Sequence, residues 1–439
     1  MISRILLTCV CAGAMLAETP TITLEDALKR ARQYGGQIQS ANLSALQAGE
    51  DRVQVHAGTL PQVNALNQFI YTQGNGTPSG IFVANDGVHV YNEQAIVHQE
   101  LLSLVRRGEI HRAMAAEAIA RAKIDVASRG LTAIVIQNYF AIVLAQRKYA
   151  NAQISLKEAQ RFFELSEKQE KGGEVARADV IKAQIDLQQR QRDVKESDLV
   201  VEKARIALGV LIFPNFSSDF AVVDDLQQMA ALPTADEAKA AAAASSPEIK
   251  AATAGVVAAG WDVAVARYQF VPSLAVDFFY GIDNNEFAAH STTILEPVGP
   301  SGAPVYGSVN RLGYSAQITL NIPVWNWGST RSKIKQAEFR RDQAKLDLSL
   351  ARRTLDSNLA AAYAESNAAR AQLDSLKTSE DLAAESLRLT VLRYQAGEAT
   401  ALEVVDAQNT AMTSRNANDD GLARYRIAVE NLKMLTGNL

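Results

Sequence analysis

Hydrophobic residues recur with two different periods along this chain, and each period predicts its own kind of element. Apolar and polar residues alternate strictly through residues 273–282 and again through 312–324. Such alternation is typical of a β-strand with one apolar and one polar face, because successive side chains point to opposite faces. A weaker version runs through residues 63–71 and 91–97. The pattern predicts two strand hairpins, at about residues 62–100 and 273–325.

The second period is helical. Residues 106–171 and 329–395 contain no proline and almost no glycine, and each predicts a helix about 100 Å long at 1.5 Å per residue. Within the second stretch, Leu or Ala recurs every seven residues from 348 to 383, beside a run of Leu359, Leu373, Leu387 and Tyr394. Heptad spacing indicates coiled-coil packing against neighbouring helices. Shorter helices are expected at about residues 23–60, 176–210, 247–271 and 402–435.

The chain also repeats itself. The segment GEVARADV at 173–180 matches GEATALEV at 397–404, an offset of 224 (397 minus 173), and upstream positions such as Pro61 and Pro272 match at an offset of 211 (272 minus 61). Self-similarity of this kind indicates two copies of one structural unit. We therefore expect the first repeat at residues 18–212, a linker at 213–245 and the second repeat at 246–439.

The first 17 residues have the pattern of a secretory signal peptide. Arg4 precedes an apolar run over residues 5–17, and cleavage after either Ala14 or Ala17 fits the small-residue rule. Both cysteines, Cys9 and Cys11, lie in this segment. A mature chain without thiols suits an oxidising export compartment.

Beyond this segment we expect no helix with the roughly 18 apolar residues that a membrane span requires, so a spanning part would be made of strands. Strands with one apolar face form either a soluble sandwich or an outer-membrane barrel with a wet lumen. Aromatic residues near the strand ends favour the barrel, although core packing also explains them: Tyr280, Tyr306 and Tyr314 at one end, Trp325 and Trp327 at the other.

Four strands per chain cannot close a barrel, so the oligomeric state matters. Two protomers would supply eight strands, with the interior filled by side chains, whereas three supply twelve and leave room for a channel. We therefore infer a homotrimer. The expected fold is mainly α-helical with a transmembrane β part, in which long coiled-coil helices form an α-barrel below a 12-stranded β-barrel.

Composition excludes several functions. The formal net charge of -4 argues against a nucleic-acid binder. The sequence has no nucleophile motif and no phosphate-binding glycine loop, so we expect neither an enzyme nor a cofactor. The five histidines are dispersed and predict no metal site: His56, His89, His98, His111 and His290.

Several short motifs, taken in order, resemble the TolC-like outer membrane efflux protein family over essentially the whole mature chain. They are TLEDAL at 23–28, LPQ at 60–62, VPS at 271–273, IPVWNWG at 322–328, YQAG at 394–397 and VVDAQ at 404–408. The resemblance implies a trimeric conduit in the outer membrane whose helical part extends into the periplasm. Its implied partners are a periplasmic adaptor (membrane fusion) protein and an inner-membrane pump of the RND, ABC or MFS type.

The resemblance also implies a gate at the periplasmic end. Glu403 and Asp406 match the acidic constriction of the family, where three copies of each would form a negative ring. Taken without the family, they are better explained as charges favourable to a helix N-terminus, and the resemblance reverses this preference. Tyr394 and Asp179 match a latch of the closed state, but the latch arginine of the family is replaced by Ala399. The repeated turns are expected to dock the adaptor: Gly172, Gly173, Glu174, Gly397 and Glu398.

The predicted function is thus an outer membrane channel of a tripartite export system, conducting small molecules or proteins to the exterior. The alternative is a structural or adhesive coiled-coil protein of the envelope without transport activity. That alternative accounts for the long helices but leaves the amphipathic hairpins without a role.

Overall fold

The computed structural model describes residues 20–71, 89–215, 217–229, 232–284, 290–296 and 305–438. The expected signal peptide at residues 1–17 lies outside them. The chain divides into two compact units. The helical unit comprises Met1–Ala41, Ile124–Pro247 and Arg352–Leu439, and the strand unit comprises Asn42–Lys123 and Glu248–Ala351. Each unit takes segments from both predicted repeats, whose boundaries stay a prediction.

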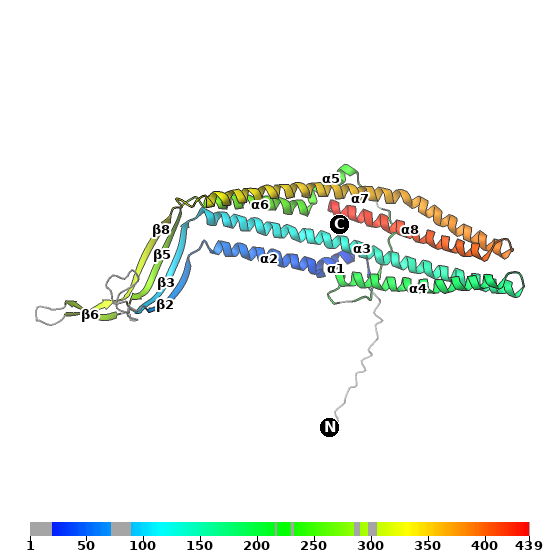
Figure 1. Ribbon diagram of the computed structural model, residues 1–439, viewed down its shortest axis with the longest axis horizontal. Coiled ribbons are helices and arrows are strands. Elements are labelled where there is room, and N and C mark those ends of the chain that lie inside the picture. The colour runs from blue at the N-terminus through cyan, green and yellow to red at the C-terminus, as the bar shows by residue number, and fades with distance from the viewer. Residues whose placement is uncertain are drawn as a thin grey trace, which may run out of the picture. The chain divides into compact units, whose positions relative to one another are not determined.

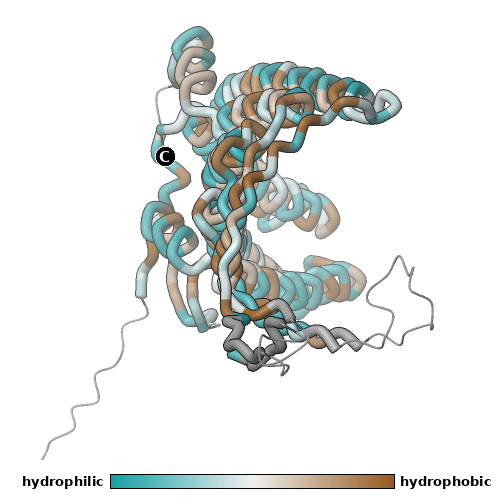
Figure 2. The backbone as a smooth tube through the Cα atoms, turned by 90° about the vertical axis from the view of Figure 1, so that its left-hand side faces the viewer, coloured by the Kyte–Doolittle hydropathy of each residue, from teal (hydrophilic) through white to brown (hydrophobic). Residues whose placement is uncertain are grey.

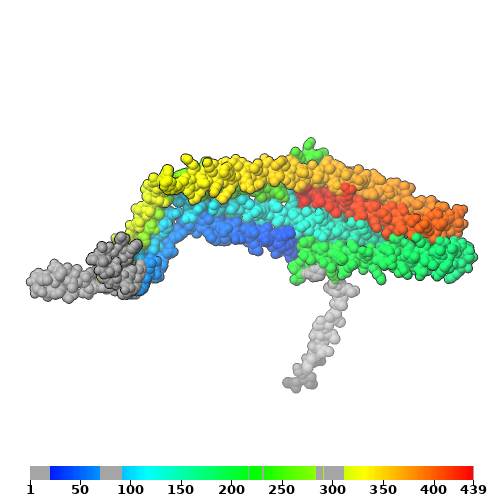
Figure 3. Space-filling model, viewed as in Figure 1, coloured from blue at the N-terminus to red at the C-terminus, as the bar shows by residue number. Residues whose placement is uncertain are grey.

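Two helical hairpins dominate the helical unit (Figure 1). Their four helices are α3 (Leu104–Lys171) with α4 (Arg177–Ile212), and α7 (Ser329–Gln395) with α8 (Ala401–Thr436). Helices α3 and α7 begin in the strand unit and end in the helical unit. Figure 3 shows the orange-to-red α7/α8 hairpin lying against the cyan-to-green α3/α4 hairpin.

The predicted heptads of α7 are confirmed by burial. Leu355, Leu359, Leu373 and Leu387 are all buried, although the residues between them are mostly exposed. Ser366, which lies midway between Leu359 and Leu373 in the second run, is also buried, and its hydroxyl donates to the carbonyl of Ala362 four residues earlier at 2.8 Å. A side chain that satisfies its own polar group in this way can occupy a core position.

The core of the helical unit forms where short elements cover α3. Its largest side chains include Tyr139 and Phe140 of α3 and Leu208 of α4. The Tyr139 hydroxyl donates to the carbonyl of Val223 at 2.8 Å, which ties the inter-repeat segment to α3. The covering elements are α1 (Leu24–Tyr34) and a parallel pair of two-residue strands, β1 (Thr21–Ile22) and β4 (Ala221–Val222). Helix α5 (Ala235–Ser245) packs against α8 instead.

The strand unit contains a four-stranded antiparallel sheet in the order β2-β3-β5-β8 (Figure 1). The predicted strands are confirmed. Their bounds are β2 (Gln62–Tyr71), β3 (His89–Leu102), β5 (Ser273–Asn284) and β8 (Leu312–Asn321). The two outer strands, β2 and β8, each have a strand partner on one side only within the described chain.

Helices of the strand unit follow the same order as the strands to which they connect. The Arg52 guanidinium of α2 (Gly36–Ala57) lies 2.7 Å from the Glu117 carboxylate of α3. On the other side of α3, the ring of His111 stacks on Trp261 of α6 (Pro247–Tyr268) with 4.2 Å between centroids. An apolar cluster then joins α6 to α7. The order is therefore α2-α3-α6-α7.

Three expectations are corrected by the structure. The helix predicted over residues 23–60 is broken at Gly35, where a Cβ would lie 2.5 Å from both the Ala31 carbonyl oxygen and a Leu131 methyl. The linker at 213–245 contains helix α5, which begins with a Thr234–Glu237 capping box. The second predicted hairpin, at about residues 273–325, contains a further hairpin between its strands β5 and β8, formed by β6 (His290–Glu296) and β7 (Val305–Asn310), which include several β-branched residues.

A fourth expectation concerned membrane-spanning helices. By length and composition, α3 and α6 are both apolar enough to cross a membrane, which contradicts the expectation of none. In α3 the apolar residues include Val135, Ile136 and Phe140, which are buried in the core of the helical unit. Figure 2 shows polar and apolar residues mixed along the helices. Two such helices are weak evidence for a span, because core helices have the same composition.

Candidate functional site at the helical turns

Both helical hairpins close with the same backbone motif at the repeated glycines. The N–H of Gly173 donates to the Glu170 carbonyl and that of Glu174 to the Gln169 carbonyl, both at 2.9 Å. These bonds define a Schellman motif, in which the residue after the helix adopts a left-handed conformation. Gly173 has a φ of 79°. This conformation explains why position 173 is glycine, because an L-residue with a Cβ would be strained there.

The second turn repeats the first bond for bond. Gly397, with a φ of 76°, donates to the Tyr394 carbonyl at 3.1 Å, and Glu398 donates to the Arg393 carbonyl at 2.8 Å. The two turns differ in how the returning helix begins. Thr400 and Glu403 form a capping box at the start of α8, whereas Ala176 gives α4 no side-chain cap. The two copies of the repeat therefore share the conformation of the turn but differ in the capping residues at the start of the returning helix.

Tyr394 anchors the α7/α8 hairpin to α3. Its ring packs edge-on against Phe162, with 5.0 Å between centroids, and only 2% of the residue is exposed. The hydroxyl donates to Ser166 Oγ at 3.2 Å. Burial raises the pKa of the Tyr394 hydroxyl, and the negative charge of Asp179 raises it further. Among the described residues, the hydrogen-bond partner of this hydroxyl is thus Ser166 rather than Asp179.

The predicted constriction residues lie on one exposed face of α8, three residues apart. One carboxylate oxygen of Glu403 accepts from the Thr400 backbone and hydroxyl, both at 3.2 Å. The other oxygen lies 3.5 Å from the Arg393 guanidinium. The Asp406 side chain is exposed. Sequence reasoning missed Arg393, which also donates to the Glu398 carbonyl at 3.0 Å and so braces the second turn.

The first turn also has an arginine that forms an ion pair. Arg177, at the start of α4, pairs with Glu170 of α3 at 3.1 Å across the turn. Asp179 is partly buried, and Ala399, at the position of the family's latch arginine, packs against the apolar cluster around Tyr394. Gly172 and Glu174 are exposed at the tip of the hairpin.

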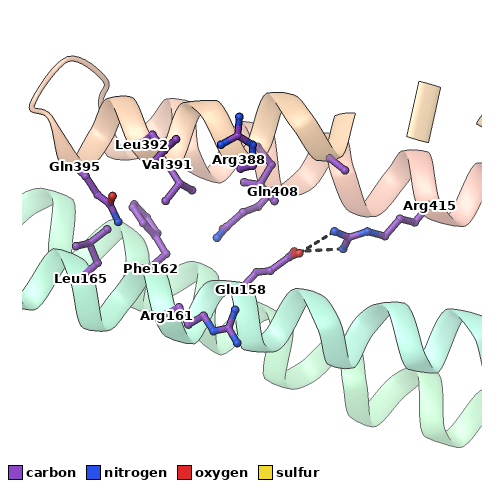
Figure 4. Close-up of a pocket in the computed structure, with 12 residues that line it drawn as sticks. Glu158, Arg161, Phe162, Leu165, Arg388, Val391, Leu392, Gln395, Gln408 and Arg415 are labelled. Carbon is purple, nitrogen blue, oxygen red and sulfur yellow. Dashed lines mark hydrogen bonds and ion pairs between the residues drawn. The ribbon is translucent and has the colours of Figure 1, made fainter. Parts of the chain in front are cut away.

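A groove of about 460 Å³ runs beside this cluster, between α3 and the α7/α8 hairpin (Figure 4). Apolar residues and arginines both line it, among them Phe162, Leu165, Val391, Arg161 and Arg388. At its far end Arg415 of α8 forms two bonds with the Glu158 carboxylate of α3, at 2.8 and 3.3 Å. Gln408 also lines the groove, and its buried Oε1 has no hydrogen-bond partner among the described residues.

Further from the tip, an ion pair within α4 is buried where α4 packs against α8. Arg190 is 3% exposed and Asp186 is 7% exposed, with 3.2 Å between guanidinium and carboxylate. Arg190 also donates to Asn409 of α8 and lies 3.4 Å from the sulfur of Met412. Burial raises the pKa of the Asp186 carboxyl, although the nearby Arg190 opposes this shift.

The predicted interface aromatics lie at opposite ends of β5 and β8. Tyr280 and Tyr314 are directly paired across these strands. Trp325 and Trp327 follow β8 and meet edge to face, with 5.7 Å between centroids. All four side chains are exposed in the single chain. The side chain of Tyr306 lies outside the described residues. No group of three or more metal-binding side chains occurs in the described chain.

The second half of the chain is similar to a known family. Residues 240–438 match the model of the outer membrane efflux protein family. Residues 240–438 therefore form an outer membrane efflux protein domain. This match agrees with the expected family and with the expected outer membrane location, and the family comprises channels rather than enzymes.

Curated relatives agree with the family but align only in part. The chain is 27% identical to outer membrane protein OprJ of Pseudomonas aeruginosa over 186 residues, which cover 42% of this chain and 36% of OprJ. It is 24% identical to the cobalt-zinc-cadmium resistance protein CzcC of Cupriavidus metallidurans over 315 residues, covering 71% of this chain and 68% of CzcC. The alignment with OprJ thus spans about a third of that relative.

Solved structures confirm the predicted fold. The outer-membrane channel OprN superposes with a TM-score of 0.78 at 18% identity, covering 95% of this chain and 90% of OprN. The outer membrane protein VceC of Vibrio cholerae gives a TM-score of 0.76 at 16% identity, covering 94% of this chain and 96% of VceC. The architecture of the outer membrane efflux family is therefore present along almost the whole chain.

Proposed function

We propose that this protein is the outer membrane channel of a tripartite export system. It conducts small molecules or proteins from a periplasmic adaptor and an inner-membrane pump to the exterior. The channel is a homotrimer whose strands form a barrel in the outer membrane and whose helices form a tube in the periplasm.

The observation that carries this proposal is the chemistry of the four-stranded sheet. One face of the sheet bears apolar residues on β3, β5 and β8. Their side chains are exposed in the single chain, for example those of Tyr314 (77%) and Ile318 (72%). The opposite face bears polar residues. A sheet of this kind is stable with lipid on one face and water on the other, as in an outer-membrane barrel.

The edges of the sheet favour a closed ring of identical chains. β2 and β8 each have ten residues and one free edge, and their directions alternate, so β8 of one protomer pairs antiparallel with β2 of the next. Three protomers close a barrel of 12 strands, from 4 per chain. Helices α2 and α7 are the corresponding edges of the strand unit. They expose large apolar side chains for the same contact: Leu43, Leu46 and Val53 on α2, Phe339, Leu346 and Leu350 on α7.

At the periplasmic end, Glu403 and Asp406 of three protomers form the acidic constriction. Such a ring favours cations and binds blocking multivalent cations. Replacing Glu403→Gln together with Asp406→Asn should lower the cation selectivity of single channels and their block by trivalent cations. Glu174→Gln, at the other turn, is the matched control and should leave both unchanged. Equal block in the double variant and in the wild type contradicts the ring.

The closed state is latched around Tyr394. Its buried contacts with Phe162 and Ser166 hold the second hairpin, and Asp179 supplies negative charge nearby. Since Ala399 carries no charge, Arg393 and Arg177 are the arginines that form ion pairs at the two turns. The Asp179→Ala variant should raise single-channel conductance, whereas unchanged conductance removes Asp179 from the latch.

The adaptor docks at the two turns, on Gly172, Gly173, Glu174, Gly397 and Glu398. These residues are exposed at the hairpin tips. The neighbouring groove adds apolar and basic surface to the same end of the helical unit.

Membrane extraction and bilayer recording test the proposal together. A trimeric channel requires detergent for release, runs as a heat-sensitive oligomer and conducts ions in planar bilayers. A structural coiled-coil protein of the envelope is released by salt and conducts nothing. That second outcome would support the structural alternative.

A further inference from the structure

A row of four polar residues crosses the whole sheet of the strand unit at one level. Strand register places Gln62 of β2 opposite His98 of β3, His98 opposite Asp277 of β5, and Asp277 opposite Gln317 of β8. Residues directly opposite one another on paired strands share a face of the sheet. The row therefore lies on the polar face of the sheet. Gln62 is the first residue of β2, Asp277 lies four residues after the start of β5, and Gln317 lies four residues before the end of β8.

The centre of the row is a hydrogen-bonded pair of titratable groups. His98 Nδ1 lies 2.6 Å from Asp277 Oδ1. The His98 and Asp277 side chains are 38% and 22% exposed, so solvent reaches both of them. A carboxylate at this position orients the imidazole, because it accepts the Nδ1 proton and leaves Nε2 as the site for a second proton.

Few other charged side chains lie near the His98–Asp277 pair on this face of the sheet. The neighbours of His98 and Asp277 on the outer strands are the uncharged Gln62 and Gln317. Two residues along β3, the same face carries Ile96 on one side and Glu100 on the other. The carboxylate of Glu100 lies 3.4 Å from the Arg106 guanidinium. On β5 the next residues of this face, on either side of Asp277, are Ala275 and Phe279.

The charge of the pair depends on whether the imidazole carries its second proton. With a neutral imidazole the pair has the single negative charge of Asp277, and with an imidazolium it has none. Histidine is the side chain whose charge ordinarily changes between pH 5 and 8. Around a closed trimer the row would therefore carry three negative charges with neutral imidazoles and none with protonated ones.

We propose that His98 and Asp277 are selectivity-determining residues of the barrel lumen, and that they make its preference for cations dependent on pH. This inference rests on the proposed function, because the polar face lines a lumen only when three chains close the barrel. It concerns the strand unit and is separate from the acidic turn residues of the helical unit. Fixed charge on a pore wall selects ions of the opposite sign.

The reversal potential of the purified channel in a salt gradient tests the proposal. The cation-to-anion permeability ratio of the wild type should fall about twofold between pH 8 and pH 5.5, a modest change because salt screens charges in a wide pore. Free carboxyl side chains ordinarily titrate near pH 4, below this range. His98→Gln should abolish the change and keep the ratio at its pH 8 value.

Asp277→Asn should have a different signature. The ratio should already be low at pH 8, and it should fall further at pH 5.5, where an unpaired imidazolium favours anions. Asp277→Glu should restore the response to pH. The matched control is His56→Gln, which removes an exposed histidine of α2 and should respond to pH as the wild type does.

Two failures are distinguishable. A channel that conducts but whose selectivity does not change with pH, or one in which His98→Gln still responds, overturns this inference alone. A pair that only joins β3 to β5 would lower the thermal stability of the variants without altering the pH response, which also contradicts it. A protein that conducts no ions contradicts the proposed function itself and the lumen with it.

Discussion

Replacing Arg190 with methionine tests the ion pair of α4 that is buried against α8. The variant keeps most of the side-chain volume but leaves the Asp186 carboxylate, 7% exposed, without its counter-charge. Removing one partner of a buried pair ordinarily costs about 3–5 kcal/mol, because an uncompensated charge remains in a poorly solvated place. Since each 1.36 kcal/mol corresponds to a factor of ten, local opening should increase by about two to four orders of magnitude.

Hydrogen exchange of amides in α4 and α8, measured on the detergent-solubilised protein, reports this opening without requiring global unfolding. After correction for intrinsic rates, amides around residues 186–193 and 405–412 should exchange faster in Arg190→Met. The effect should shrink as pH falls. Burial raises the pKa of Asp186, so the folded state takes up its proton before the unfolded state does, and the penalty on the charged form is lost below that raised pKa.

Two further variants sharpen the result. Arg190→Met combined with Asp186→Leu should recover most of the protection, because an apolar pair of similar size replaces the ion pair. Arg192→Met, which changes an exposed arginine two residues away, should alter protection by no more than about 0.5 kcal/mol. The reasoning is refuted if Arg190→Met exchanges like Arg192→Met, or if the double variant is no better protected than the single one.

Other predictions concern the turns and the packing of the hairpins. Gly397→Ala should destabilise the α7/α8 hairpin by about 1–2 kcal/mol, because Gly397 has a left-handed φ. Gly255→Ala should instead stabilise the protein by about 0.5–1 kcal/mol, because Gly255 lies in the interior of α6 and the new Cβ would have no atom within 4 Å. Hydrogen exchange measures both effects, and equal effects of the two variants contradict the turn argument. Gly421→Ala should be worse than either, because its Cβ would meet a Leu376 methyl, and thermal inactivation of the oligomer should reveal a lower midpoint. Tyr394→Phe should cost only about 0.5–1.5 kcal/mol, since Ser166 keeps its bond to the Phe162 carbonyl, and a larger loss in hydrogen-exchange protection would show that the hydroxyl has a further partner.

Much of the fold was predictable because its elements have strong periodic signals. The period-two alternation located all four strands of the sheet, and the run from 329 to 395 gave α7 its observed bounds. The repeated glycines located both turns, since a Schellman motif requires a left-handed residue at that position. These features depend on local sequence and are visible in it.

Features that depend on distant contacts were missed. The break at Gly35 arises partly from the approach of Leu131, nearly a hundred residues away, and no local pattern announces it. Arg190 and Asp186 have the spacing of any surface ion pair on a helix, and only the packing of α8 on α4 buries them. The partner of Tyr394 is likewise a residue of another helix, Ser166, which no motif distinguishes.

Some missed features did have a local signal. The Thr234–Glu237 capping box announces the start of α5 within the supposed linker. The pairing of Arg393 with Glu403 joins two residues on either side of a turn that was itself predicted. A basic residue in the last turn of one helix and an acidic residue in the first turn of the next helix can form an ion pair when the connection between the helices is short.

Disulfide trapping between the edge strands tests the central claim most directly, since the only native cysteines, Cys9 and Cys11, lie in the expected signal peptide. Gln317→Cys on β8 is combined in turn with Gln62→Cys, Asn64→Cys or Leu66→Cys on β2, and the oxidised protein is separated by mass. The account predicts that one pairing yields a covalent species of three chains and nothing larger, because three heterologous contacts close the ring. Failure of every pairing to link copies, or a ladder that continues beyond three chains, contradicts the trimeric conduit.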